Sequence, residues 1–295
     1  MGVSVNVTEQ TNPIAARSSL HSIIPVVGGI AGGTRPDLLA IEEPLEIRLG
    51  YQTPERWATR AISITMRTPG HDFELAAGFL RGEGIIRSQA DITGISRLGP
   101  GERNVVKVDL APSVRFDPSR LERSFYTTSS CGVCGKGSLD AISNRGFEAI
   151  PLGAVQFPAR ILQDLPSNLR SVQATFEETG GLHAAALFSP AGELLAVRED
   201  VGRHNAVDKV TGYLLLENIP VPEGSALLVS GRTSFELAQK TIAAGIPILA
   251  AVGAPSTLAV EFAREFDLTL VGFIRDGRFN IYSREERIQY EAGSI

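Results

Sequence analysis

The sequence of 295 residues has very few cysteines: it contains only Cys131 and Cys134, which are separated by two residues. A disulfide framework needs several pairs, so a small disulfide-rich secreted protein is excluded and a reducing cytoplasm is expected. Net basic charge is also lacking, because the formal charge is −5. A protein of this charge is a poor nonspecific binder of nucleic acids or of anionic membranes.

Long hydrophobic runs are absent as well. No stretch of about 18 or more apolar residues occurs, so no membrane-spanning helix is expected. The mildly apolar segment 23–33 is broken by Pro25 and by glycines and has no basic leader, so we expect no signal peptide. Residues 1–37 are rich in Ser, Thr, Gly and Pro without periodicity, and this composition predicts a flexible N-terminal tail.

The remaining chain alternates strand-like and helix-like segments. Residues 38–125 predict a small α/β domain, with strands at 45–49, 61–66, 92–97 and 105–110 and a helix at 75–80. Residues 126–137 are predicted to form a loop that holds both cysteines. From 138 to 295, short apolar strands alternate with helical segments, which indicates a larger α/β domain with a mainly parallel sheet. Within it the sequence predicts a helix across 169–177, a hairpin of strands 182–188 and 194–198, a strand at 226–230 and a helix at 234–244.

The cysteines lie in the stretch S-S-C-G-V-C-G-K at 129–136. Its glycines permit tight turns, and a nearby cation such as Lys136 favours the reactive thiolate form of cysteine. A lone C-x-x-C fits a redox dithiol, half of a zinc site, or a sulfur carrier that holds a persulfide; incidental loop cysteines are the plain alternative. A closed zinc site needs about four ligands. No second cysteine pair exists and the four histidines are scattered, so no metal site is expected.

Four turns concentrate polar side chains at the ends of predicted elements. Segment 199–209 follows a strand and opens a helix, where backbone amides and the helix dipole favour an anion. Segment 230–234 is a second strand-to-helix junction, and ligands of open α/β sheets lie at such junctions. His183 begins an apolar strand, and the turn at 67–72 enters a helix. Each segment could instead have a purely structural role: the polar residues at the helix starts could cap those helices, and His183 could be a buried histidine that binds no ligand.

Several of these motifs, in this order, resemble the FdhD family, the formate dehydrogenase accessory sulfurtransferases. The resemblance lies in S-C-G-V-C-G at 130–135, E-D-V-G-R-H-N-A-V-D-K at 199–209 and V-G-F-I-R-D-G-R at 271–278, and in the turns at 68–74, 179–183 and 230–232. It covers roughly residues 38–290 and leaves out the N-terminal segment.

The resemblance implies a cytoplasmic homodimer that takes persulfide sulfur from a cysteine desulfurase. The sulfur would pass to the molybdenum or tungsten bis(molybdopterin guanine dinucleotide) cofactor, bound as a substrate, before this cofactor enters the client formate dehydrogenase. GDP-like nucleotides are expected to occupy the same site, and neither nucleic acid nor membrane is implied as a partner. The implied fold is α/β, with a larger C-terminal cytidine-deaminase-like three-layer domain and a smaller N-terminal α/β domain.

Residue roles follow from the resemblance and from the turns together. Cys131 would hold the persulfide and Cys134 would assist it. A highly anionic guanine dinucleotide explains a local cluster of arginines and lysines in an acidic protein. No metal ligand is predicted, and the predicted cofactor-binding residues are Phe273, Ile274, Arg275, Asp276, Gly277, Arg278, Asp200, Arg203, His204, Asn205, Lys209, Ser230, Gly231, Arg232 and His183.

Three rival functions are weighed against sulfur transfer. Zinc deaminases use H-x-E with P-C-x-x-C, but Ser130 replaces the proline, and His71-Asp72-Phe73 lacks the glutamate. A thioredoxin-type redox protein would carry its C-x-x-C at a helix start near the beginning of a compact domain. A cofactor-binding chaperone without chemistry would keep the turns and would not need the thiols. The redox and chaperone alternatives stay open.

Overall fold

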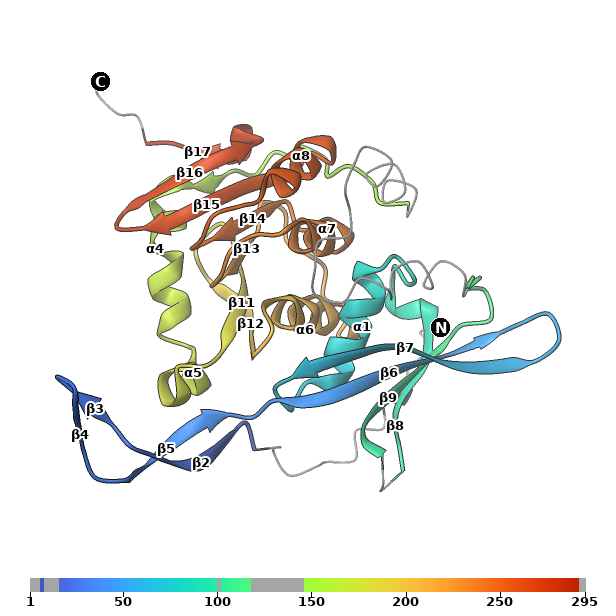
Figure 1. The fold of residues 1–295 in the computed structure, drawn as a ribbon. Coiled ribbons are helices and arrows are strands. Elements are labelled where there is room, and N and C mark those ends of the chain that lie inside the picture. Colours follow the sequence, from blue (N-terminus) through green and yellow to red (C-terminus); the bar gives the residue numbers. More distant parts are fainter. Residues whose placement is uncertain (1–5, 8–15, 100–101, 118–145, 292–295) are drawn as a thin grey trace.

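The computed structural model of the protein describes residues 6–7, 16–99, 102–117 and 146–291 (Figure 1). The predicted cysteine loop 126–137, with Cys131 and Cys134, lies outside the described residues. In the described ranges, no helix is both long and apolar enough to span a bilayer.

A five-stranded sheet is built from the first third of the chain. Its apolar strand residues alternate, and one face packs on helix α1 (Asp72–Gly82). The strands and the helix predicted at 45–110 lie within these elements and are confirmed. The strand order is β1 (Asn6–Val7), β8 (Ile92–Leu98), β9 (Glu102–Leu110), β6 (Glu43–Gln52) and β7 (Trp57–Arg67).

A six-stranded mixed sheet is built from the second half of the chain. Strands β13, β14 and β15 run parallel, whereas β12, β11 and β16 are antiparallel to their neighbours. The prediction of a mainly parallel sheet is therefore wrong, because hairpins add antiparallel strands on both sides of the parallel core. The strand order is β12 (Leu194–Asp200), β11 (His183–Phe188), β13 (Ala226–Val229), β14 (Ile248–Ala251), β15 (Thr269–Arg275) and β16 (Arg278–Ser283).

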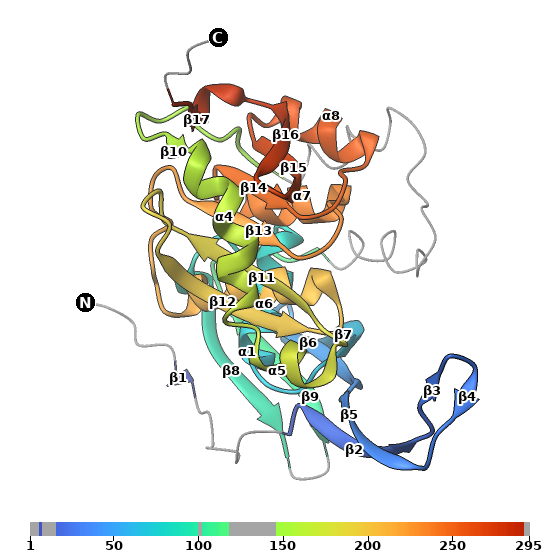
Figure 2. The same ribbon diagram turned by 90° about the vertical axis from the view of Figure 1, so that its left-hand side faces the viewer.

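Helices cover both faces of this sheet (Figures 1 and 2). One face packs on α6 (Arg203–Leu216), α7 (Phe235–Ala243) and α8 (Thr257–Glu265). The other face packs on the leucines of α4 (Ala159–Arg170), the helix nearest the viewer in Figure 2. The result is three layers, helices–sheet–helix, and the predicted α/β fold class is confirmed.

Smaller elements complete the second half. The helix predicted across 169–177 is wrong as a single element, because α4 ends at Arg170 and a new short helix, α5 (Ala174–Thr179), follows. Short strands β10 (Phe157–Pro158) and β17 (Ile288–Gln289) pair in parallel, and a 3-10 turn at Glu285–Arg287 precedes β17. A second 3-10 turn, at Gln89–Asp91, precedes β8 in the first part of the chain.

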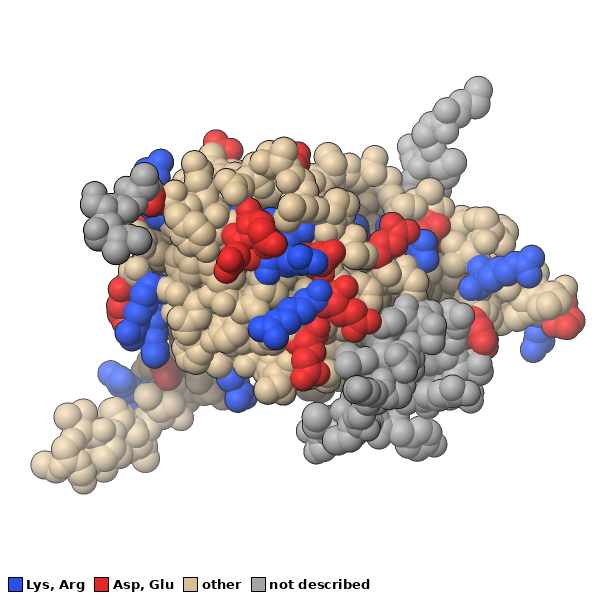
Figure 3. Space-filling model, turned by 90° about the horizontal axis from the view of Figure 1, so that it is seen from above, with Lys and Arg blue, Asp and Glu red and all other residues tan. Residues whose placement is uncertain are grey.

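Residues 18–40 form a two-stranded arm that projects from the body (Figure 1). Its turn is Gly28-Gly29, with φ of 59° and 81°, a conformation that glycine adopts readily. The flexible tail predicted for 1–37 is therefore wrong for 18–37, where main-chain pairing orders a segment without apolar periodicity. The end of the arm has no charged side chains (Figure 3). Its strands are β2 (Ser18–Ile23), β3 (Val26–Val27), β4 (Ile30–Ala31) and β5 (Arg35–Ala40).

Helix α1 of the first sheet lies directly against α6 of the second (Figure 1). A Cβ atom on Gly78 would lie 1.9 Å from the Asp208 carbonyl oxygen, and one on Gly212 would lie 1.8 Å from the Glu74 carbonyl oxygen. No real Cβ comes so close to a backbone atom, so the two helices meet backbone to backbone. This crossing brings the turn between β7 and α1 next to the end of β12.

Candidate functional site

The candidate site lies along one edge of the six-stranded sheet. The parallel strands β13, β14 and β15 end at this edge, which is where open α/β sheets bind ligands. His183 opens the antiparallel strand β11 there, opposite Asp200 at the end of β12. The His183 Nδ1 atom is 3.4 Å from Ser230 Oγ, in the loop that follows β13. The structure thus brings predicted residues from separate segments to one edge.

Backbone hydrogen bonds join the loops that follow the parallel strands. The Gly253 N–H donates to the Gly231 carbonyl at 3.1 Å, and the Phe273 N–H donates to the Gly253 carbonyl at 3.1 Å. A Cβ on Gly253 would lie 3.0 Å from that Gly231 oxygen and 3.0 Å from Arg232 Cγ, so a side chain there would be crowded. The loop 253–256 was not predicted as part of the site. The rule that selected 230–234, a turn between a buried strand and a helix, also applies to it.

Phe273 has a left-handed backbone, with φ of 56°, inside the irregular pairing of β15 with β16. Such a conformation is costly for a residue with a side chain and is often found at ligand sites. The Asp276-Gly277 turn, at φ 53° and 70°, closes the β15–β16 hairpin as its sequence favours. Arg275 and the following three residues are exposed, whereas Ile274 is buried in the core and does not face the edge.

Imidazole and guanidinium groups gather where α6 begins. Arg203 Nε is buried and has no hydrogen-bond partner among the described residues. The Cδ of Arg203 and the ring of His183 both lie beside Gly231. His204 Nε2 is 3.0 Å from Ser234 Oγ and 2.9 Å from Glu236 Oε2. Because the serine and the carboxylate contact the same ring nitrogen, these three side chains do not form an acyl-transfer triad.

Burial, and then the charges of Arg203 and His204, lower the pKa of His183, while Asp200 opposes them. We therefore expect His183 to titrate below the ordinary histidine value of 6.5. When folding lowers the pKa of a histidine, the neutral ring stabilises the folded protein at pH values above the ordinary pKa of 6.5. This contribution to the free energy of unfolding is lost as the pH falls through the lower pKa of the folded state. The wild type should thus lose more stability than His183→Gln on acidification. Ring titration by NMR, with urea unfolding above and below pH 6.5, is the measurement, and an unshifted His183 contradicts the expectation.

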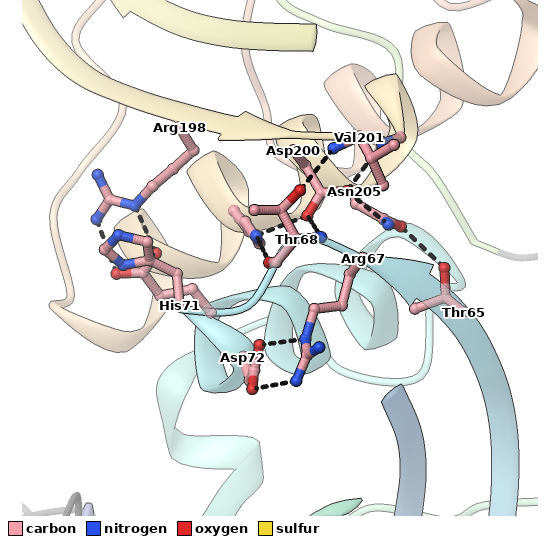
Figure 4. Close-up of polar contacts among 12 residues, drawn as sticks. Thr65, Arg67, Thr68, His71, Asp72, Arg198, Asp200, Val201 and Asn205 are labelled. Carbon is pink, nitrogen blue, oxygen red and sulfur yellow. Dashed lines mark hydrogen bonds and ion pairs between the residues drawn. The ribbon is translucent and has the colours of Figure 1, made fainter. Parts of the chain in front are cut away.

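Asp200 and Lys209 lie beneath the edge and are fully buried, with the Lys209 Nζ atom 2.6 Å from Asp200 Oδ2. Asn205 Nδ2 donates to Asp200 Oδ1 at 3.0 Å and to the Met66 carbonyl at 2.7 Å (Figure 4). Burial lowers the pKa of Lys209, and Asp200 opposes this effect. These three residues were predicted to contact the ligand. In the structure they bind the segment that ends β7 instead, so the prediction of direct contact needs correction.

The turn at 67–72 connects the five-stranded unit to the six-stranded unit. The side chain of His71, the N-cap residue, does not cap α1; instead, Arg67 forms a buried bidentate pair with Asp72, at 2.9 and 3.1 Å. Arg198 of β12 holds Glu74 at 2.6 and 2.7 Å (Figure 4). Burial acts to raise the pKa of Glu74, but hydrogen bonds from Arg198 and His71 outweigh it, and the net pKa is lowered. The predicted capping role of this turn is thus replaced by two ion pairs: Arg67–Asp72 within the first unit, and Arg198–Glu74, which joins the two sheet units.

The structure places no group of three His, Cys, Asp or Glu side chains for metal binding in the ranges that it describes. Cys131 and Cys134 lie outside these ranges. The expectation that the protein has no metal site therefore stays a prediction.

Comparison with known proteins gives a consistent result. A model of the FdhD/NarQ family matches residues 40–289. The sulfur carrier protein FdhD of Streptomyces coelicolor is 52% identical over 270 residues, which are 89% of this chain and 93% of that protein. The protein of the same name from Mycolicibacterium paratuberculosis is 51% identical over 260 residues, 86% of this chain and 93% of that protein.

A crystal structure from Desulfotalea psychrophila, described as a formate dehydrogenase accessory protein, aligns with a TM-score of 0.69. It is 26% identical and the alignment covers 93% of this chain and 100% of that chain. The motifs at 199–209 and 230–232, the sheet edge on which they meet, and these matches lead to one conclusion: the chain belongs to the FdhD/NarQ family.

Proposed function

We propose that this protein is a sulfur carrier that accepts persulfide sulfur on Cys131 from a cysteine desulfurase. It delivers the sulfur to a molybdenum or tungsten bis(molybdopterin guanine dinucleotide) cofactor destined for a formate dehydrogenase. The observation that carries the proposal is the single C-x-x-C pair in a chain whose relatives are named sulfur carrier proteins FdhD. The accessory-protein description of the Desulfotalea psychrophila structure supports a formate dehydrogenase as client. A cytoplasmic location and a homodimer belong to the same proposal.

The first transfer is an exchange between a thiolate and a persulfide. The Cys131 thiolate attacks the outer sulfur of the donor persulfide, a new S–S bond forms on Cys131, and the donor leaves as a thiolate. No net oxidation occurs, so no further reactant is needed. Lys136 is close in sequence and would favour the thiolate form of the nucleophile.

The edge of the six-stranded sheet is the proposed binding surface for the cofactor. A guanine dinucleotide carries several negative charges, and the edge presents Arg203 together with exposed arginines of the β15–β16 hairpin. Arg203 Nε and Thr233 Oγ1 are buried there without a hydrogen-bond partner in the described part of the chain, as expected of groups that await a ligand. An anionic nucleotide such as GDP should therefore bind. Adenine nucleotides are expected to bind less well, because the proposed cofactor carries guanine.

The test is mass spectrometry of the whole protein, and then of its proteolytic peptides, after incubation with a cysteine desulfurase and cysteine. The peptide that contains Cys131 is expected to gain the mass of one sulfur atom, and this gain should disappear on reduction. Cys131→Ser, treated in the same way, is the matched control. Elemental analysis of untreated protein belongs to the same experiment. About one zinc per chain with two unreactive thiols would overturn the proposal, because zinc would hold both thiolates.

A further inference from the structure

We propose that Thr68, in the turn from β7 into α1, is a positioning residue for the cofactor-binding edge. Thr68 belongs to the five-stranded unit, whereas the edge belongs to the six-stranded one. It would act by fixing where α6 begins, and hence where Arg203 and His204 stand. The inference rests on the proposed function for the identity of the ligand.

Each hydrogen-bonding group of Thr68 contacts the other unit (Figure 4). Its N–H donates to Asp200 Oδ2 at 3.2 Å, and its hydroxyl oxygen accepts from the Val201 N–H at 3.2 Å. Its carbonyl accepts from Lys209 Nζ at 2.9 Å. Thr68 is 1% exposed, so no solvent competes for these bonds. Thr68 is therefore held to the end of β12 and to α6 at the same time.

Asp200 passes this constraint to the start of α6. Its Oδ1 accepts from the N–H of Gly202, the N-cap residue, at 2.8 Å, and from Asn205 Nδ2 in the first turn at 3.0 Å. Gly202 has no side chain of its own to cap the helix. The Oδ1 atom of Asp200 therefore holds the start of the helix. Its Oδ2 atom is fixed by Thr68 and Lys209 together.

Arg203 and His204 follow Gly202 directly, so they move with it. The Cδ of Arg203 lies 3.6 Å from the position of a Cβ on Gly231, and His204 reaches Ser234 at the start of α7. A shift of the α6 start would therefore separate these two side chains from the loop after β13. Thr68 itself does not contact that loop in the structure, so its effect on a ligand there would be indirect.

The test replaces Thr68 with Val, which keeps the shape and removes the hydroxyl, and with Ser, which keeps the hydroxyl. Thr68→Val leaves the Val201 N–H without a partner, and we expect the Kd for GDP to rise about tenfold. Thr68→Ser should restore affinity close to that of the wild type. Calorimetric titration of the full chain with GDP gives the Kd, and thermal unfolding of the same samples gives Tm.

The matched control is Glu74→Gln. It weakens the Glu74–Arg198 ion pair, which also joins the two units but does not contact Asp200 or Gly202. This variant should lower Tm and leave the Kd for GDP unchanged. If Thr68→Val raises the Kd no more than Glu74→Gln at a similar loss in Tm, Thr68 is only structural and the inference is wrong.

Wild-type protein that does not bind GDP would count against the guanine ligand of the proposed function. The positioning role is then decided by the activity of a co-expressed formate dehydrogenase. Thr68→Val must lower that activity, Thr68→Ser must restore it, and Glu74→Gln must leave it unchanged. Equal activity of Thr68→Val and the wild type would overturn the inference.

Discussion

Cys131→Ala is expected to reduce the activity of a co-expressed formate dehydrogenase to that of cells without the protein. The thiolate is the group that accepts the persulfide, and the chain has only one other thiol, at Cys134. Cys134→Ala is expected to retain part of the activity, because Cys134 is assigned an assisting role. The measurement is formate oxidation by the purified client enzyme, at matched levels of each variant.

Cys131→Ser is the control that separates chemistry from folding. It changes only the sulfur atom to oxygen, so its unfolding transition and circular dichroism should match those of the wild type, while client activity is lost. Full client activity with Cys131→Ala would rule out a persulfide on Cys131. It would favour the alternative of a chaperone that binds the cofactor without chemistry. A reversible Cys131–Cys134 disulfide with no sulfur gain would favour the redox alternative.

Most elements of the six-stranded sheet could be predicted because each is short, apolar and bounded by turn residues. The strand predicted at 226–230 and the helix predicted at 234–244 agree with β13 and α7 within one or two residues. Since parallel strands end at one edge, the sequence also predicted that the polar turns after them would share a site. The antiparallel strands β11 and β12 were recognised as a hairpin, but their place in the sheet depends on tertiary pairing.

The direction of a polar side chain at a junction could not be predicted. Asp200 and Arg203 stand three residues apart in the same turn, yet Asp200 is fully buried and Arg203 reaches the edge. The two differ because Asp200 accepts a hydrogen bond from Thr68, which is 132 residues away in the sequence. A local pattern of polar residues is the same whether they face a ligand or a neighbouring unit. Only the packing of α1 on α6 decides between the two.

The arm and the loop 253–256 were missed for different reasons. The arm has the turn signal Gly28-Gly29, but a composition rich in Ser, Thr, Gly and Pro without apolar periodicity predicts a flexible tail for the whole segment. The loop 253–256 contains no charged residue, so its role became visible only through the backbone bonds of Gly253. Backbone groups bind ligands and support neighbouring loops without leaving a distinctive side chain in the sequence.

Gly212→Ala is expected to lower the free energy of unfolding by about 3 kcal/mol or more, or to prevent folding. Alanine favours a helix interior over glycine by about 1 kcal/mol, so α6 itself should gain stability. The loss must therefore come from the crossing, where the new methyl carbon would lie 1.8 Å from the Glu74 carbonyl oxygen. A backbone oxygen inside a helix cannot move aside as a flexible side chain can, so α1 and α6 must separate.

The matched control for this prediction is Gly94→Ala in β8, where a Cβ would have no atom within 4 Å. The chemical change is the same, and the expected effect is within about 0.5 kcal/mol. Urea unfolding of both variants gives the comparison. If Gly212→Ala were as stable as Gly94→Ala, α1 and α6 would not meet backbone to backbone. The proposed positioning role of Thr68 would then lose its structural basis, because this helix crossing places the turn after β7 against Asp200.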